Sequence, residues 1–137
     1  MLDDLGLVSA LTSLVTEHAR LTGAEVCRRL STDLPPLGPD AELVVYRVAQ
    51  EALTNVARHA DARRVCVDLA PTFAGDAVQL RVADDGRGLG DVREGAGMRG
   101  MRERAVLVAA TLTIGPHQEG GTELRLLVPA PGPEDGR

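Results

Sequence analysis

The sequence predicts an α+β fold: a two-layer α/β sandwich with a mixed, mostly antiparallel sheet of about five strands and about three helices on one face. Two observations lead to this prediction. Apolar residues recur at helical spacing in three segments, and they alternate with polar residues in several short segments. In chain order the segments run helix, strand, helix, two strands, helix, two strands, an order that suits helices packed on one side of a sheet.

The first half of the chain is expected to hold two helices and one strand. Apolar residues at helical spacing predict a first helix that ends near Gly23, and residues 25–31 (EVCRRLS) predict a strand. A proline-rich connection follows, which neither a helix nor a central strand would tolerate. Asp40 is then expected to cap a second helix that runs to about His59.

The second half is expected to hold four strands and one helix. Two alternating segments, separated by Gly75 and Asp76, predict an antiparallel hairpin. The domain is expected to span residues 1–129, with a disordered tail at 130–137. The elements are expected at 64–69 and 76–83 for the hairpin, 84–100 for a glycine-rich connection, 101–110 for the third helix, and 111–114 and 122–128 for the last two strands.

Length, charge and hydropathy exclude several classes of protein. The 137 residues suit one domain with one core, and the net charge of −5 argues against binding of nucleic acid, which favours a basic surface. No signal peptide opens the chain and no apolar run approaches the ~18 residues that cross a bilayer, so we expect this chain to be cytoplasmic and to make no membrane contact, while a membrane anchor elsewhere in the full-length protein stays open. Cys27 and Cys66 lie in apolar, strand-like runs, and we expect both to be reduced, buried thiols.

The second predicted helix carries a polar stripe whose groups suit a metal–phosphate site. Helical spacing places Arg47, Glu51, Asn55 and Arg58 on one face, with His59 beside them. A carboxylate and an amide oxygen can hold Mg²⁺ directly or through water, and a guanidinium can bind phosphate. A solvated helix surface would also explain the stripe, although Asn is a poor residue for mid-helix. The opposite face is apolar and suits the core: Val45, Ala49, Leu53, Val56 and Ala60.

A glycine-rich run, VADDGRGLGD, follows the second strand of the hairpin. Its spacing differs from the dinucleotide fingerprint, and a Walker A loop is excluded because the chain contains no lysine. Asp84 at the strand end can accept a hydrogen bond from the amino group of adenine. Guanine would be rejected because it presents an oxygen acceptor at the same place. A simple turn would also explain the motif.

The run REGAGMRGMRERA comes next, where glycines precede the third predicted helix. Free N–H groups at a helix N-terminus bind anions, and Arg99, Arg102 and Arg104 add positive charge there. A flexible surface loop before a capped helix is the alternative. Near the C-terminus, GGTELRLLV likewise fits a hairpin turn followed by an ordinary edge strand.

Taken in order, these segments resemble the motifs of the ATPase domains of histidine kinases. QEALTNVARHA resembles the N box, DDGRG the first glycine box, GAGMRGMRERA the second glycine box with the ATP lid, and GGTELRLLVP the last motif. GMRERA and the opening LDDLGLVSAL resemble sensor kinases that pair with response regulators carrying helix-turn-helix output domains. The resemblance covers nearly the whole chain except the tail and implies the α/β sandwich of GHKL ATPases.

Carried over residue by residue, the resemblance implies a site for ATP and Mg²⁺. Asn55 would be the Mg²⁺ ligand, with Glu51 positioning a water or the metal. Arg58 would contact phosphate, His59 would lie near the nucleotide, and Asp84 would bind the adenine amino group. The other implied contacts are Gly86 and Gly88 in the pocket, Gly97, Met98, Arg99, Gly100, Met101 and Arg102 in a lid over the phosphates, and Thr122 supporting the adenine contact.

The implied reaction is transfer of the γ-phosphoryl group of ATP to a histidine. In the family that histidine lies in an ELHD-type motif on an upstream dimerisation domain, and His18, His59 and His117 have no such context. We therefore expect this chain to bind ATP as a monomer without phosphorylating itself. Its expected partners are the dimerisation domain of the same kinase, homodimeric at full length, and, indirectly, a response regulator.

Three other functions share this type of ATPase fold. A serine kinase of the anti-sigma-factor type would phosphorylate a partner protein, but GMRERA and the LDDLGL opening argue against it. A non-enzymatic module that binds ATP and docks a partner is disfavoured by the intact Glu51 and Asn55. An ATPase of the gyrase or mismatch-repair type needs a transducer domain, for which 137 residues leave no room.

Overall fold

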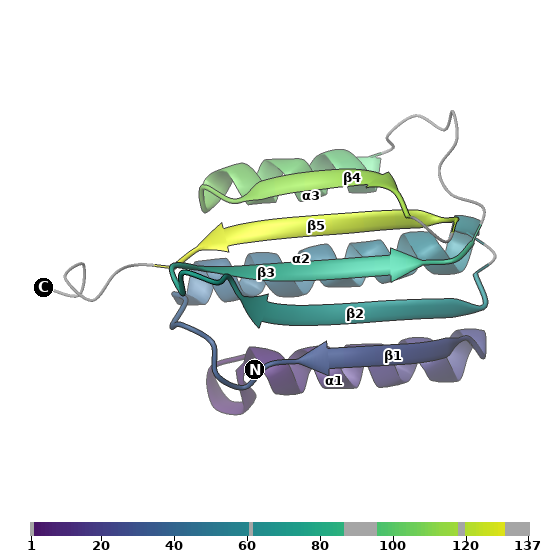
Figure 1. The fold of residues 1–137 in the computed structure, drawn as a ribbon, viewed down its shortest axis with the longest axis horizontal. Coiled ribbons are helices and arrows are strands. Elements are labelled where there is room, and N and C mark those ends of the chain that lie inside the picture. The colour runs from purple at the N-terminus through teal and green to yellow at the C-terminus, as the bar shows by residue number, and fades with distance from the viewer. Residues whose placement is uncertain (1, 61, 87–95, 118–119, 131–137) are drawn as a thin grey trace, which may run out of the picture.

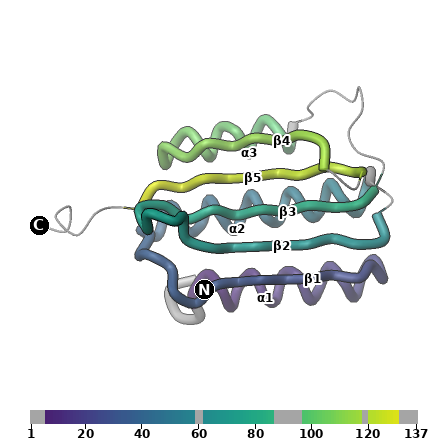
Figure 2. The backbone as a smooth tube through the Cα atoms, viewed as in Figure 1, coloured from purple at the N-terminus to yellow at the C-terminus, as the bar shows by residue number. Residues whose placement is uncertain are grey.

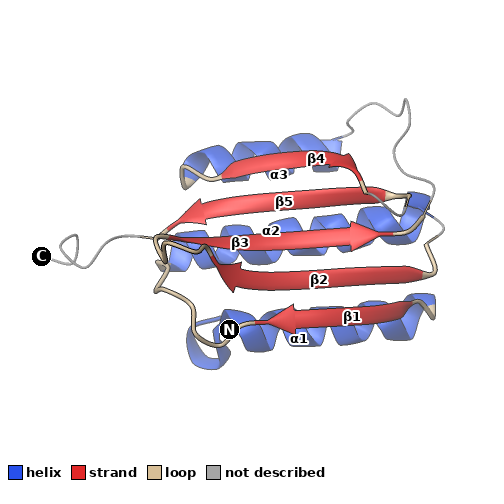
Figure 3. Ribbon diagram, viewed as in Figure 1, coloured by secondary structure: helices blue, strands red, loops and turns tan. Residues whose placement is uncertain are grey.

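The computed structural model describes residues 2–60, 62–86, 96–117 and 120–130. It is a two-layer α/β sandwich in which the helices cover one face of a five-stranded sheet (Figure 1, Figure 3), so the predicted fold class is confirmed. The elements are α1 (Leu2–Thr22), β1 (Glu25–Leu30), α2 (Pro39–Asn55), a π-helical turn η1 (Val56–Ala60), β2 (Arg64–Pro71), β3 (Ala77–Asp84), α3 (Ala96–Leu107), β4 (Thr111–Pro116) and β5 (Thr122–Pro129).

The sheet has the strand order β1-β2-β3-β5-β4. β1 pairs with β2 in parallel, and the other neighbours are antiparallel. A parallel pair needs a crossover connection, and α2 supplies it between β1 and β2. The predicted hairpin is confirmed as β2 and β3, joined through a turn in which Gly75 has a φ of +77°.

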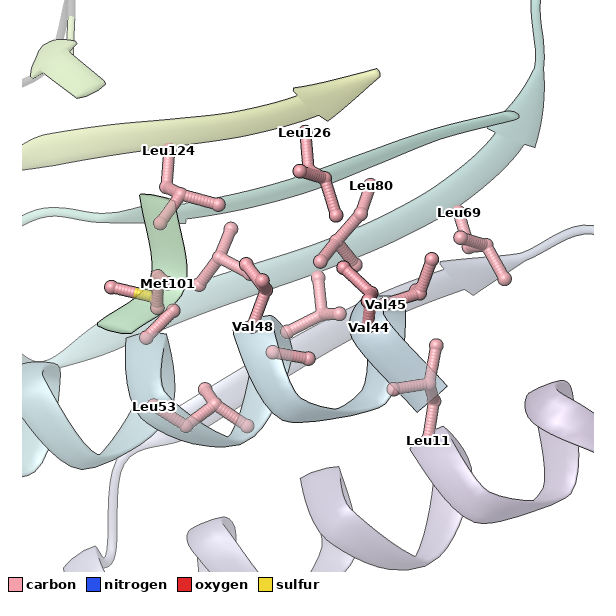
Figure 4. Close-up of a cluster of buried hydrophobic side chains, with 14 of the residues drawn as sticks. Leu11, Val44, Val45, Val48, Leu53, Leu69, Leu80, Met101, Leu124 and Leu126 are labelled. Atoms are coloured by element: carbon pink, nitrogen blue, oxygen red, sulfur yellow. The ribbon is translucent and has the colours of Figure 1, made fainter. Parts of the chain in front are cut away.

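The core lies between the sheet and the helices and is almost entirely aliphatic. Alternate strand residues point toward α2, whose buried face includes Val45, Ala49 and Leu53, as expected (Figure 4). Burial of each Val or Leu side chain contributes roughly 1.5–3 kcal/mol, so this layer is the main source of stability. The inward strand residues are Val65, Val67 and Leu69 in β2, Val78, Leu80 and Val82 in β3, and Leu124, Leu126 and Val128 in β5.

The ends of α1 and α2 agree with the prediction in part. α1 stops before Gly23, whose φ of +72° fits the expected glycine stop. α2 begins at Pro39 with Gly38 as N-cap, so Asp40 lies in the first turn and does not cap the helix as expected. Proline suits the first helical position because an N–H there would have no intrahelical partner. Of the tail expected at 130–137, residues 131–137 lie outside the described residues.

The third helix begins earlier than predicted. α3 begins at Ala96, whereas the glycines before residue 101 had suggested a loop. Met98, Met101 and Ala105 are buried at helical spacing, so the first turns of α3 have an apolar stripe facing the core. Packing of this stripe outweighs the low helix propensity of the glycines.

The expectation for the two cysteines is wrong. Cys27 and Cys66 form a disulfide, with their Cα atoms 4.6 Å apart, and both side chains are only half-buried. The two residues are register partners in the parallel pair of β1 and β2, and they lie on the face of the sheet opposite the helices. Residues separated by 39 positions became neighbours through strand pairing, which local patterns did not reveal.

The same outer face carries a row of ion pairs. The Arg29 guanidinium lies 3.0 Å from the Asp68 carboxylate, and Arg81 contacts Asp68 at the same distance. Arg81 also binds Glu123, which in turn binds Arg125 at 2.7 Å. Isolated surface pairs are worth little, but this row links β1, β2, β3 and β5 and keeps their outer face polar. Among the described residues, no helix is long and apolar enough to cross a membrane.

His18 on α1 is a buried polar residue within the helix layer. Its side chain is only 7% exposed. Its Nε2 atom has no hydrogen-bond partner in the part of the chain that the structure describes. Burial lowers the pKa of His18 below the ordinary value of 6.5 because the charged imidazolium is poorly solvated there.

We expect the burial of His18 to make the free energy of unfolding depend on pH. Below pH 6.5 the unfolded chain binds a proton that the folded imidazole, with its lowered pKa, still refuses, so stability is lost as the pH falls. Urea unfolding at pH 7.5 and 5.5 should show a loss of about 1 kcal/mol from this group. His18→Leu should remove that part of the difference without loss of stability at pH 7.5. An unchanged difference in the variant would contradict the assignment.

Candidate functional site

Segments from four parts of the chain meet at one end of the sheet, where β3 ends and β5 begins (Figure 2). Asp84 is the last residue of β3 and Thr122 the first of β5. The C-terminal end of α2 and the first turn of α3 contact each other through Glu51 and Gly97. This end of the molecule is the candidate site.

Asp84 is the buried acid of the site, with 4% of its surface exposed. Burial raises its pKa above the ordinary 3.8, and hydrogen bonds from the backbone N–H groups of Gly86 and Thr122 partly oppose that rise. The bond from Gly86 to Oδ1 is 2.8 Å long. The carboxyl group is therefore fixed in position by two segments, the residues after β3 and the start of β5.

Gly121 allows this arrangement, although the sequence had indicated only a turn there. Its φ is +80°, and a Cβ atom at this position would overlap the backbone carbonyl of Asp84 and lie 2.7 Å from its Oδ1. Only glycine combines this backbone conformation with such a close approach. The signal in the sequence was the glycine pair directly before β5, whose first member, Gly120, has more room.

Asp85, the neighbour of Asp84, bonds to the backbone at the start of β2, a role that the sequence did not reveal. Its Oδ1 accepts hydrogen bonds from the backbone N–H groups of Arg63 and Arg64, at 3.0 and 2.9 Å. Its own N–H donates to the carbonyl oxygen of Arg64 at 3.2 Å. Asp85 thus anchors the end of β3 to the beginning of β2, while Asp84 remains available to the site.

Glu51 and Asn55 lie one turn apart on α2, and both are partly exposed. The Glu51 carboxylate occupies the space next to Gly97 that a Cβ atom would need, so the N box and the second glycine box are in direct contact. Within the described residues, neither side chain has a hydrogen-bond partner. The carboxylate and amide oxygens are therefore free to accept bonds or to bind a cation.

The next two residues of the predicted stripe lie in the π-helical turn after α2. Arg58 is exposed, and its guanidinium can reach toward an anion from the end of the helix. The backbone of His59 belongs to the same turn, but its side chain lies outside the described residues, as does all of Gly88. Arg47, at the other end of the stripe, bonds to Gln50 at 3.1 Å and points to solvent.

The six residues expected in a lid lie in α3 and not in a loop. The side chains of Met98 and Met101 are buried in the core. Arg102 donates a hydrogen bond to the carbonyl oxygen of Leu112 at 3.2 Å, whereas Arg99 is exposed. The glycine-rich segment 87–95 lies outside the described residues.

The donor set suits a metal ion that the protein holds together with a phosphate ligand. Among the described residues, no three His, Cys, Asp or Glu side chains come together as a metal site. Glu51 and Asn55 supply two oxygen donors, too few to enclose an ion. Mg²⁺ commonly binds one or two protein oxygens together with phosphate oxygens and water, so these two residues fit Mg²⁺ bound with a nucleotide.

Comparison with known proteins agrees with this geometry. Residues 40–132 match the family described as histidine kinase-, DNA gyrase B- and HSP90-like ATPase. The sensor histidine kinase MctS of Rhizobium johnstonii is 36% identical over 135 residues, which are 94% of this chain and 29% of that protein. The sensor histidine kinase YxjM of Bacillus subtilis is 38% identical over 93 residues, 66% of this chain and 22% of that protein. The chain thus spans less than a third of these curated relatives.

Solved structures share the fold at lower sequence identity. A histidine kinase domain from a blue-light-activated kinase of Erythrobacter litoralis superposes with a TM-score of 0.74 at 21% identity, covering 90% of this chain and 61% of that one. The ATP-binding domain of PrrB from Mycobacterium tuberculosis gives a TM-score of 0.65 at 22% identity, covering 91% and 94%. The superposition on the PrrB domain therefore covers nearly the full length of both chains.

The contact between Gly121 and Asp84 predicts a large effect of one methyl group. Gly121→Ala should lower the free energy of unfolding by about 2–4 kcal/mol, because a positive φ is unfavourable for Ala and its Cβ would overlap Asp84. Gly120→Ala, with a positive φ but open space, should lose only about 1–2 kcal/mol. Urea unfolding measures both, with Gly115→Ala as the unstrained control. Equal losses at Gly120 and Gly121 would contradict the close contact.

Proposed function

The chain belongs to the family of histidine kinase-, DNA gyrase B- and HSP90-like ATPases, and on that premise we propose that it is the Mg²⁺·ATP-binding catalytic domain of a sensor histidine kinase. One observation carries the proposal: a buried, fixed Asp84 and the available oxygens of Glu51 and Asn55 lie at the same end of the sheet. The sensor histidine kinases among its relatives support the same function.

Asp84 would recognise adenine. Its carboxylate would accept a hydrogen bond from the exocyclic amino group, and Gly86 and Thr122 would keep it oriented by their own bonds to it. Guanine places an oxygen acceptor there, so two acceptors would face each other without a proton between them. Gly86 and Gly88 would line the pocket.

Glu51 and Asn55 would hold Mg²⁺, and arginines would bind the phosphates. When bound, Mg²⁺ supplies charge neutralisation for the phosphate oxygens. Arg58 and Arg99, both exposed, would bind phosphate oxygens, and His59 would lie beside the nucleotide. Gly97, Gly100 and Arg102 would complete the phosphate contacts from the first turns of α3. The burial of Met98 and Met101 supports a structural role for these two residues in the lid.

The proposed reaction is phosphoryl transfer to a histidine of the dimerisation domain. The bond between the γ-phosphorus and the β,γ-bridging oxygen breaks, a bond from the histidine nitrogen to that phosphorus forms, and ADP leaves. This chain contributes positioning and charge stabilisation, and the partner domain contributes the nucleophile. In the full-length protein, proposed to be a homodimer, the phosphoryl group would pass to a response regulator. We propose a cytoplasmic location, where ATP is available.

The sequence relatives favour this function over the other candidates. A serine kinase of the anti-sigma-factor type or an ATP-dependent docking module would use the same nucleotide site, but the relatives over 94% and 66% of the chain are sensor histidine kinases. GMRERA within α3 and the opening LDDLGL support a response regulator with a helix-turn-helix output domain as the final acceptor.

Nucleotide preference tests the role of Asp84. Calorimetric titration with Mg²⁺ should show ATP binding tighter than GTP by about 10-fold or more, as expected for a charge-assisted hydrogen bond. Asp84→Asn should weaken ATP binding by about 10-fold. Asp85→Asn is the matched control, since that neighbouring carboxylate bonds to the backbone of β2, and it should keep the preference for ATP. Equal affinities of the unaltered protein for ATP and GTP would refute the proposed adenine contact.

Metal dependence tests the role of Asn55. Asn55→Ala should lose about 1–3 kcal/mol of nucleotide-binding free energy in Mg²⁺, because a ligand oxygen is removed, and little in EDTA. Asn55→Asp should retain most of the Mg²⁺-dependent binding. Gln50→Ala removes an amide of the same helix that already accepts a hydrogen bond from Arg47, and it should behave like the unaltered protein. Full Mg²⁺-dependent affinity in Asn55→Ala would show that the metal assignment is wrong.

A further inference from the structure

The disulfide between Cys27 and Cys66 lies outside the proposed phosphoryl-transfer chemistry. These are the two cysteines of the chain, and they face each other across β1 and β2 on the outer surface of the sheet. β1 is an edge strand and pairs within the sheet with β2 alone. The disulfide therefore joins an edge strand to the interior of the sheet at a position that is only half-buried.

Small molecules can approach this disulfide. Both cysteines line a hollow of about 360 Å³, together with Arg29, Arg64 and Ala83. A volume of this size is in the range that admits small ligands. The thiolate is the reactive form of cysteine, and nearby guanidinium groups favour it. The hollow thus gives a small molecule access to the two sulfur atoms and places both arginine and aspartate residues beside them.

The same hollow extends to the end of β3. Asp84 and Asp85 also line it. Cys66 is the register partner of Ala83, the residue before Asp84. Two hydrogen bonds run alongside: the N–H of Glu25 at the start of β1 donates to the carbonyl oxygen of Arg63 at 2.9 Å, and the N–H of Arg63 donates to the side-chain Oδ1 of Asp85 at 3.0 Å. These bonds connect the start of β1 to Asp85, the residue next to Asp84.

We propose that Cys27 and Cys66 form a reversible thiol–disulfide site that exchanges with a low-molecular-weight disulfide, such as oxidised glutathione, and that oxidation strengthens nucleotide binding at Asp84. The second part rests on the proposed function. A disulfide in an ATP-using, cytoplasmic domain is more often transient than structural, because the cytosol keeps thiols reduced. The site lets the domain respond to the thiol–disulfide balance around it.

The exchange proceeds in two balanced steps. One cysteine thiolate attacks a sulfur of glutathione disulfide, forming a mixed disulfide and releasing one glutathione thiolate. The other cysteine thiolate attacks the protein sulfur of that mixed disulfide, forming the bond between Cys27 and Cys66 and releasing the second glutathione. The two protons lost by the cysteines appear on the two released glutathiones, and the two electrons have passed from the cysteines to the small disulfide.

The first experiment measures the exchange without nucleotide. The folded 137-residue chain is equilibrated with graded ratios of reduced to oxidised glutathione, thiols are trapped by alkylation, and mass spectrometry counts them. We expect one reversible transition between the dithiol and the disulfide, with Tm about 10 °C higher for the disulfide form. Cys27→Ser and Cys66→Ser should each accumulate a mixed disulfide with glutathione, and the double variant should not respond. A disulfide that exchanges only after unfolding, or thiols that never oxidise, would overturn the proposal.

The second experiment measures the connection to the nucleotide site. Oxidised protein should bind a non-hydrolysable ATP analogue about fivefold more tightly than reduced protein, and the double variant should show no dependence on the glutathione ratio. Hydrogen exchange at the amides of Arg63 and Arg64 should be slower after oxidation, a readout that needs no nucleotide. Equal exchange and equal affinity in the two states would refute the coupling. Absence of nucleotide binding in both states would refute the proposed function. The thiol count and the amide exchange would then still show whether Cys27 and Cys66 exchange reversibly and whether oxidation slows exchange at Arg63 and Arg64.

Discussion

A carboxylate buried at the end of a central strand must be surrounded by groups that bond to it, and the arrangement around Asp84 follows from this constraint. The backbone N–H groups of Gly86 and Thr122 supply those bonds, and Gly121 must lack a side chain so that the start of β5 can approach. The contact between Gly121 and Asp84 depends on the register of β3 against β5, on the turn before β5 and on the bend after β3. The aliphatic layer beneath the sheet provides the rigid support.

The two acidic residues of the site are prepared for different chemistry. Asp84 is buried and already bonded, which favours selection of one base edge over another. Glu51 is partly exposed, lies one turn from Asn55 and borders the first turn of α3, which favours contact with a hydrated cation and phosphate. In the proposed function, recognition of the base and charge neutralisation would thus fall to opposite layers of the sandwich, the sheet and the helices, and a bound nucleotide would span both.

Periodicity predicted the fold because each element buries one face. Val78, Leu80 and Val82 alternate as a strand with one buried face must, and the apolar stripe of α2 recurs at helical spacing. The start of α3 was missed because propensity depends on local residue types, whereas Met98 and Met101 are held by tertiary packing.

Contacts between distant segments were also missed. The disulfide, the Gly121 contact and the anchoring bonds of Asp85 all join segments that become neighbours only through sheet topology. Motif order could indicate that a nucleotide site exists, but not which backbone groups hold its acid in place. The strand order has a further consequence for biosynthesis: β5, the last of the described strands in chain order, lies between β3 and β4 and carries Thr122. A nascent chain therefore cannot complete this sheet, or bring Thr122 next to Asp84, until β5 has left the ribosome.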